Sequence, residues 1–121
     1  MTKSAILLES VTKYYDLYTR ALNNVSLAIS EGDWVSIIGP SGSGKTTLLN
    51  MLGALDTPTS GEVIIDGVNI SGMRDKQLTL IRRHMIGPIF QFYNLIPVLT
   101  AFENVELPMI FAGFPKDVRA A

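Results

Sequence analysis

Gly39-Pro40-Ser41-Gly42-Ser43-Gly44-Lys45-Thr46 is the stretch of this sequence that decides the fold. It satisfies the pattern G-x-x-x-x-G-K-[ST] at every fixed position. The short β-branched run Trp34–Ile38 precedes it, and a helical pattern that continues to Leu52 follows it. Strand, glycine-rich loop and helix in this order are typical of a phosphate-binding loop, so we predict an α/β protein built around one.

Each fixed residue of the loop has a physical task. Gly42 and Gly44 permit positive φ angles, so that successive amides can converge on phosphate oxygens, and the following helix adds about half a positive charge at its N-terminus. Lys45 supplies a cation for the β- and γ-phosphates, and Thr46 offers a hydroxyl ligand for Mg²⁺. The alternative, a structural turn with a surface lysine, requires neither the spacing nor the Lys-Thr pair.

Further strands are indicated by alternating or β-branched runs on both sides of the loop. An Asp-Gly pair at Asp66-Gly67 predicts a tight hairpin turn, which makes Asp66 a poor candidate for a metal-binding aspartate at the end of a buried strand. The expected strands cover Ser4–Val11, Leu22–Ile29, Trp34–Ile38, the two arms of Glu62–Ile70, and Ile86–Phe90.

Two further helices are expected in the second half of the chain. Asp75–Arg83 has apolar residues at helical spacing behind an acidic first turn. Thr100 and Glu103 form a capping-box pair, and this helix is expected to run until Pro108 disturbs it. The ending Lys116–Ala121 has the pattern of a helix in its first turns.

The composition excludes several classes of functional site. The chain has 121 residues, a formal net charge of −1, no cysteine and one histidine. Disulfide scaffolds, thiolate metal sites and cysteine nucleophiles are excluded, and no broad cationic surface favours nucleic acid as a partner. The uncharged stretch from His84 to Phe102 contains proline, glycine and amide side chains, so we interpret it as soluble core and loop rather than a membrane span.

A phosphate-binding loop alone does not select among nucleotide-binding enzymes. Neither an Asn-Lys-x-Asp guanine-binding string nor an Asp-x-x-Gly string occurs in the sequence, which disfavours a GTPase. The basic, tyrosine-containing segment expected of a guanylate kinase is also missing from it.

Several spaced motifs together resemble the N-terminal half of an ATP-binding-cassette (ABC) ATPase, particularly the subgroup that drives lipoprotein release and macrolide export. The resemblance covers nearly the whole chain. It implies a partial P-loop NTPase (RecA-like) core with a small antiparallel β element at the N-terminal side. The motifs are Val11–Tyr15 with Ala21–Leu27, the loop Gly39–Leu49, Pro58–Val63, and Ile89–Pro97.

The resemblance assigns roles to individual residues. Tyr15 would stack on adenine, with Tyr14 as the competing candidate, and the aromatic surface suits that task. Gln91 would be the Q-loop glutamine, which reaches Mg²⁺ when the γ-phosphate is present. The implied ATP-binding residues are Tyr15, Gly39, Pro40, Ser41, Gly42, Ser43, Gly44, Lys45, Thr46 and Thr47, and the implied Mg²⁺ ligands are Thr46 and Gln91.

The same resemblance implies partners and a location. The loop from Gln91 to Pro97 would receive a transmembrane permease subunit, and two nucleotide-binding domains would dimerise in the full-length protein. The protein would be cytoplasmic, peripheral at the inner face of the cell membrane. Its role would be to bind ATP and power the export or extraction of a substrate there.

Other family motifs do not occur in the sequence: the Leu-Ser-Gly-Gly-Gln signature, and the Walker B aspartate with its glutamate. We therefore expect residues 1–121 to be a partial nucleotide-binding domain, truncated before these motifs, that binds ATP without efficient hydrolysis. Pro88 departs from the family pattern and cannot donate to a sheet ladder, which bears on where Gln91 lies. Two alternatives stay open: a small phosphotransferase with Asp66 and Glu62 at a metal, and a non-catalytic regulatory fragment.

Overall fold

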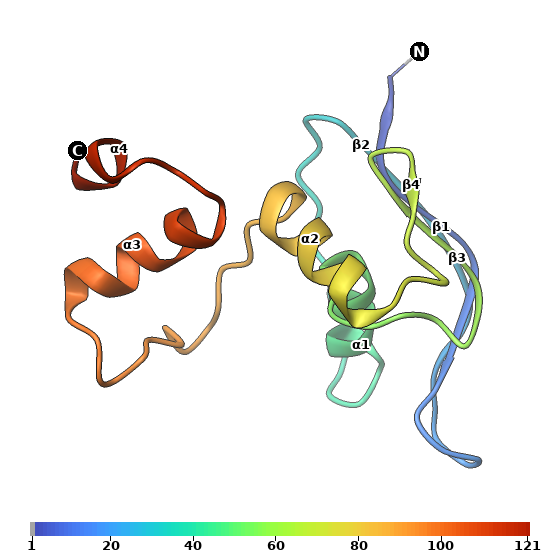
Figure 1. Cartoon of the computed structure of the whole chain (residues 1–121). Helices are drawn as coiled ribbons and strands as arrows, with labels where there is room; N and C mark the ends of the chain where they lie inside the picture. The colour runs from blue at the N-terminus through green and yellow to red at the C-terminus, as the bar shows by residue number, and fades with distance from the viewer. Residues whose placement is uncertain (1) are drawn as a thin grey trace. The chain divides into compact units, whose positions relative to one another are not determined.

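The computed structural model describes residues 2–121. Its N-terminal part, up to Asn69, contains a four-stranded antiparallel sheet (Figure 1). Its strands run in the order β2-β1-β3-β4. The sheet confirms the two N-terminal strands and the hairpin that the sequence predicts, with the first two strands a few residues longer than expected. The strands are β1 (Ser4–Tyr14), β2 (Arg20–Ser30), β3 (Ser60–Ile65) and β4 (Val68–Asn69).

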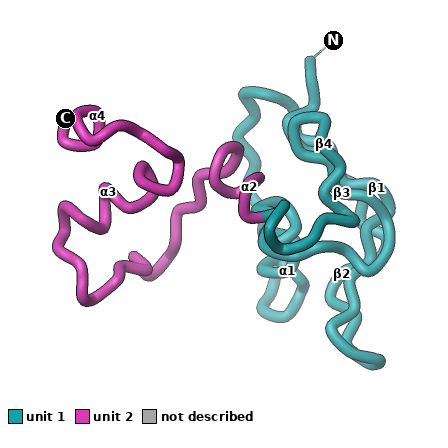
Figure 2. The backbone as a smooth tube through the Cα atoms, viewed as in Figure 1, with its two compact units in different colours: residues 1–78 teal, residues 79–121 magenta. Residues whose placement is uncertain are grey.

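The chain divides into two compact units, residues 1–78 and 79–121 (Figure 2). Unit 1 contains the sheet and α1 (Lys45–Leu52), which contacts β2 and β3. Apolar side chains from these elements form its core, and Leu8, Val11, Met51 and Val63 are almost completely buried there. Helix α1 begins at Lys45, as the sequence predicts, so the core of unit 1 fixes the helix that follows the glycine-rich loop.

A two-residue turn at Asp66-Gly67 joins β3 to β4. Both residues have positive φ angles, 46° and 78°, and Ile65 pairs with Val68 across the turn. Such a turn matches the right-handed twist of the strands, and Asp-Gly is a preferred sequence for it. The structure therefore confirms the hairpin.

A β-bulge interrupts β1 at Ser10. From Leu8 to Val11 the strand advances three positions, while the paired residues of β2 advance two, from Leu27 to Val25. The extra residue, Ser10, has a φ of 51°. On the other side of β1, a Cβ atom at Gly61 would collide with the Ser10 carbonyl, so only glycine fits opposite this bulge.

The expected strand at Trp34–Ile38 is wrong. These residues are in no strand of the described chain, and the side chains of Trp34 and Ile38 are 100% and 92% exposed. A β-branched run favours an extended backbone, but a strand also requires a neighbouring ladder. Within residues 2–121 the sheet has the order β2-β1-β3-β4, and none of its strands pairs with this segment.

Unit 2 begins within α2 (Asp75–Met85) and also contains α3 (Ala101–Phe111) and α4 (Lys116–Ala120). Helix α2 confirms the prediction and extends two residues past Arg83. The expected strand at Ile86–Phe90 is wrong, because the segment is irregular. Gly87 and Pro88 explain this: the first favours an irregular backbone, and the second has no N–H for a ladder.

Helix α3 starts with the predicted capping box. Thr100 Oγ1 accepts from the Glu103 amide at 3.2 Å, and the Thr100 amide donates to Glu103 Oε2 at 2.7 Å. The sequence predicts that Pro108 disturbs this helix. In the structure, however, the helix continues through Pro108 to Phe111. Proline removes one helical bond, yet the Pro108 carbonyl accepts from the Ala112 amide at 3.0 Å, so the helix resumes after it.

No helix within residues 2–121 combines the length and apolar character needed to cross a membrane.

Candidate functional site

A cavity of about 530 Å³ lies in unit 1 where the β1–β2 connection, the glycine-rich loop and the start of α1 meet. Three regions that are distant in the sequence thus contribute to one site. The cavity is lined by Tyr15, Thr19, Arg20, Ala21, Ser41, Gly42, Gly44, Lys45, Thr46 and Thr47.

The glycine-rich loop has the predicted backbone conformation. Gly42 and Gly44 have φ angles of 80° and 97°, in the left-handed region that favours glycine. A Cβ atom at Gly44 would also lie 2.5 Å from the carbonyl oxygen of Ala21, at the start of β2. Glycine at this position therefore lets the loop pack closely against the sheet.

The N-terminus of α1 opens into the cavity through Lys45, Thr46 and Thr47. Its N-cap is Gly44, which has no side chain to occupy the first amides, and no acidic residue lies in the first turn. The positive end of the helix dipole is therefore not offset by a carboxylate of its own first turn. This combination fits an anion such as a phosphate.

Lys45 is held against the loop by main-chain oxygens. Its Nζ donates to the Gly39 carbonyl at 2.5 Å and to the Pro40 carbonyl at 2.7 Å. Ser43 Oγ donates to the same Pro40 carbonyl at 2.7 Å. Gly39, Pro40 and Ser43 are thus placed by the structure around the lysine, rather than among the residues that line the cavity.

Tyr15 lies at the cavity and is fixed from two sides. Its hydroxyl is 3.1 Å from Oγ1 of the buried Thr47 in α1, and its amide donates to the Thr19 carbonyl at 3.0 Å. The side chain is 53% exposed, so aromatic surface is available to a ligand. Tyr14 is not among the lining residues, and its amide donates to Thr59 Oγ1 instead. This arrangement favours Tyr15 over Tyr14 as the stacking candidate.

The connection between β1 and β2 is closed by Asp16. Its Oδ1 accepts from the amides of Tyr18 and Thr19, both at 2.7 Å. These bonds to the charged form, that of the Tyr18 amide first, hold the pKa of Asp16 below its usual value. Sequence reasoning missed the lining residues Thr19, Arg20 and Ala21; an aspartate followed three residues later by threonine is the turn signal that marks this loop.

Gln91 belongs to unit 2, whereas the cavity belongs to unit 1. Its side chain is exposed in an irregular segment, and the apolar side chains of Phe92 and Tyr93 next to it are exposed as well. Further along, Asn104 of α3 anchors the segment, because its Oδ1 accepts from the Ile96 amide at 2.8 Å. A joint role of Gln91 and Thr46 at Mg²⁺ stays a prediction.

Asp66 occupies the hairpin turn and accepts a hydrogen bond from the ammonium of Lys3, which also pairs with Glu31. Glu62 is exposed on β3. Among the described residues no group of three or more histidine or acidic side chains is arranged to hold a metal ion. The alternative that Asp66 and Glu62 hold a metal in a small phosphotransferase stays a prediction.

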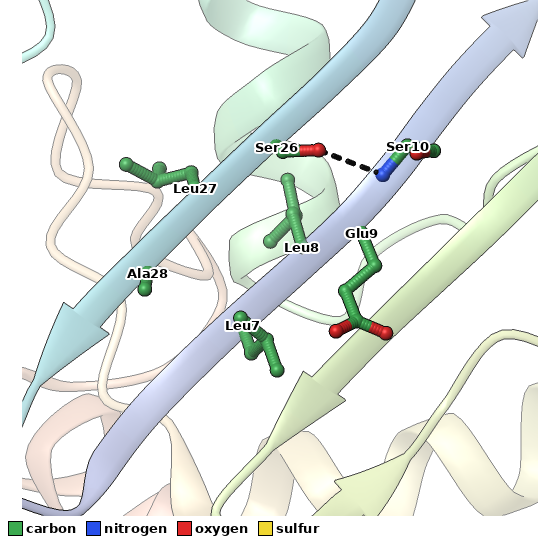
Figure 3. Close-up of a pocket in the computed structure, with 7 residues that line it drawn as sticks. All are labelled: Leu7, Leu8, Glu9, Ser10, Ser26, Leu27 and Ala28. Carbon is green, nitrogen blue, oxygen red and sulfur yellow. Dashed lines mark hydrogen bonds between the residues drawn. The ribbon is translucent and has the colours of Figure 1, made fainter.

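Two of the other cavities in the described chain differ from the cavity at the glycine-rich loop in their lining residues. One, of about 620 Å³, lies along β1 and β2 beside the Ser10 bulge, where the Ser10 amide donates to Ser26 Oγ at 3.0 Å (Figure 3). The other, of about 640 Å³, is an apolar cavity of unit 2 between residues of α2 and α3. Neither includes a glycine-rich loop or a helix N-terminus at the cavity, so neither resembles a phosphate site.

The glycine-rich loop that leads into the N-terminus of α1 is the local feature of a P-loop fold, and the similar solved structures are ATP-binding cassettes. Comparison with known proteins agrees: the family described as "ABC transporter" matches residues 22–121. The chain belongs to the ABC transporter family.

Relatives of named function lie in the predicted subgroup. The lipoprotein-releasing system ATP-binding protein LolD of Bacteroides fragilis is 47% identical over 108 residues, which are 89% of this chain and 50% of that protein. The macrolide export ATP-binding/permease protein MacB of Hyphomonas neptunium is 49% identical over 122 residues, 98% of this chain and 19% of that protein.

A solved structure is also similar. The dimeric post-hydrolysis state of the ATP-binding cassette MJ0796, bound to ADP and Pi, superposes with a TM-score of 0.86 and 52% identity over 94% of this chain and 52% of that chain. MJ0796 is from Methanocaldococcus jannaschii. The chain thus spans about half the length of such ATP-binding relatives.

Proposed function

We propose that this chain binds ATP as part of the nucleotide-binding subunit of an ABC transporter. One observation carries the proposal: Gly42 and Gly44, both at positive φ, lead into the uncapped N-terminus of α1 beside Lys45, at a cavity that Tyr15 also lines. Phosphates would bind the loop and helix amides, and the adenine would stack on Tyr15. The solved cassette MJ0796 with ADP and Pi supports this ligand class.

Mg²⁺ fits the site through Thr46. This residue is exposed and lines the cavity in the first turn of α1, and a hard cation takes oxygen ligands from a threonine hydroxyl and from phosphates. When bound, the ion would supply charge neutralisation at the β- and γ-phosphates. Gln91 is proposed as the second protein ligand. Lys45 would bind the same phosphates, and Thr47 would hold Tyr15.

The finer parts of the proposal concern hydrolysis and assembly. Residues 1–121 are proposed to form a partial nucleotide-binding domain that binds ATP without efficient turnover, because the strings that orient water and complete the dimer site do not occur in them. The loop from Gln91 to Pro97, with exposed apolar side chains, is proposed to contact a transmembrane permease at the inner face of the membrane. Dimerisation of cassettes is proposed by similarity to dimeric MJ0796.

Titration of the purified chain with ATP and Mg²⁺ tests the proposal, with released or transferred γ-phosphate followed in the same samples. Binding is expected, with little phosphate release. Lys45→Ala is expected to abolish binding, because it removes the ammonium that lies at the start of α1, beside the loop amides. Lys76→Ala, on the exposed surface of α2, is the matched control and should bind as the parent does.

Three results would contradict parts of the proposal. Unchanged affinity in Lys45→Ala would remove the phosphate-loop assignment. Rapid transfer of phosphate to an acceptor would favour a small phosphotransferase. Binding of a permease without any affinity for ATP would favour a regulatory fragment.

A further inference from the structure

Lys13 is a positively charged side chain that is largely withdrawn from solvent next to the proposed nucleotide site. It lies near the end of β1, two residues before Tyr15, and its side chain is 14% exposed. Its ammonium donates to Asp56 Oδ1 at 2.9 Å and to the Thr57 carbonyl at 2.8 Å. The same ammonium lies over the ring of Tyr15, 5.5 Å from the ring centroid.

These contacts connect two parts of unit 1 that surround the cavity. Asp56 and Thr57 follow α1, whereas Lys13 lies near the end of β1 and Tyr15 directly follows that strand. The Asp56 carboxylate is itself fixed, because Oδ1 also accepts from the Thr57 amide at 2.8 Å. Lys13 is therefore anchored to the segment after α1, and its cation is held where it faces the aromatic ring.

Tyr15 is thereby restrained at two points. Its hydroxyl bonds to Thr47 in α1, and the ammonium of Lys13 covers its ring at a distance where the cation is attracted to the π surface. A ring held in this way loses little further freedom when a base stacks on it, and such preorganisation strengthens binding. The contacts restrain an aromatic side chain that is otherwise half exposed.

We propose that Lys13, anchored by Asp56, is a positioning residue that holds the Tyr15 ring in the orientation that stacks on the base of a nucleotide. The proposal rests on ATP binding at this cavity and deepens it. Because the Asp56 carboxylate neutralises the Lys13 ammonium, the pair adds little net attraction for phosphates. The Lys13–Asp56 pair therefore contributes to affinity only when the ligand has a base, whereas Lys45 contributes to affinity through the phosphates.

Calorimetric titration with two probes tests this, Mg²⁺-ATP and Mg²⁺-tripolyphosphate, which has the phosphates without a base. The double variant K13M/D56N removes both charges together and leaves the net charge of the site unchanged. It is expected to bind ATP roughly threefold to fivefold more weakly and tripolyphosphate unchanged. K13R keeps the ion pair and the cation over the ring, and is expected to bind ATP as the parent does. K76M, at an exposed lysine of α2, is the control.

The outcomes separate the inference from the function on which it rests. If the parent chain binds neither probe, the proposed function fails and this inference with it. If the parent binds both and the double variant binds ATP equally well, or loses affinity for both probes alike, only the role of Lys13 is overturned. Should the double variant not fold, K13M alone removes the cation that covers the Tyr15 ring, and ATP affinity that is unchanged relative to tripolyphosphate in K13M would overturn the proposal in the same way.

Discussion

Gly44 is the residue of the site at which a side chain is least tolerated. Its φ of 97° strains any other residue, and a Cβ atom there would lie 2.5 Å from the Ala21 carbonyl. Gly44→Ala is therefore expected to lower the free energy of unfolding by about 3 kcal/mol, from strain and from displacement of β2. Urea unfolding followed by circular dichroism measures the loss.

Gly42 provides the matched control, because it shares the positive φ without the contact. Its φ is 80°, and a Cβ atom would meet nothing within 4 Å. Gly42→Ala should therefore cost about 1 kcal/mol, from backbone strain alone. Equal losses in the two variants would contradict the close approach of the loop to Ala21.

Among single residues, the sequence predicts those whose role depends on local geometry. The spacing of Gly42, Gly44 and Lys45 is sufficient to place the loop and the start of α1 correctly. The sequence does not predict that Arg20 lines the cavity, because its position depends on the pairing of β1 with β2. Nor does it predict that Lys13 contacts Asp56, which lies in the segment after α1. An isolated basic residue in a strand has no local signal for such a contact.

At the scale of the element, the start of α3 depends on its capping box. Thr100→Ala removes the hydroxyl that accepts from the Glu103 amide, and should destabilise this end of the helix by about 1 kcal/mol. Hydrogen exchange of the Glu103 amide is expected to become roughly fivefold faster. Thr100→Ser keeps the hydroxyl and should exchange at the parent rate. If both variants exchange as the parent does, the cap contributes nothing to the helix.

Elements that depend on neighbouring residues in the sequence were predicted well, and those that depend on distant partners were not. The Asp66-Gly67 hairpin and the capped helix α3 follow from local turn and cap chemistry. Trp34–Ile38 and Ile86–Phe90 have β-branched or aromatic residues, which indicate only that an extended backbone is acceptable. Whether such a run joins a sheet depends on a partner strand, and no local pattern includes that information.

At the scale of the whole molecule, the unpaired segment Trp34–Ile38 predicts self-association of the isolated chain. Exposed apolar side chains on a segment that joins no strand within residues 2–121 favour pairing with another copy. Trp34 is the single tryptophan, so its fluorescence reports on this segment directly. Its emission is expected to be that of a water-exposed indole in dilute solution and to shift to shorter wavelength as the protein concentration rises.

Ile38→Lys places a charge in the same segment and leaves the fluorophore intact. The concentration-dependent shift is expected to disappear in this variant, because charged residues oppose pairing at an exposed edge. Emission that does not vary with concentration in the parent chain would contradict the prediction. So would a short-wavelength emission at the lowest concentration, since it would show that Trp34 is already covered.

The two carbonyls that accept hydrogen bonds from the Lys45 ammonium determine which ligands can bind the loop. An anion in the loop can accept hydrogen bonds from the Lys45 ammonium only by displacing the carbonyl oxygens of Gly39 and Pro40. It must therefore bind the ammonium more strongly than these two oxygens do together. A polyphosphate meets that threshold, whereas a neutral nucleoside has nothing to exchange for it. The loop therefore discriminates by charge before any contact with the base contributes.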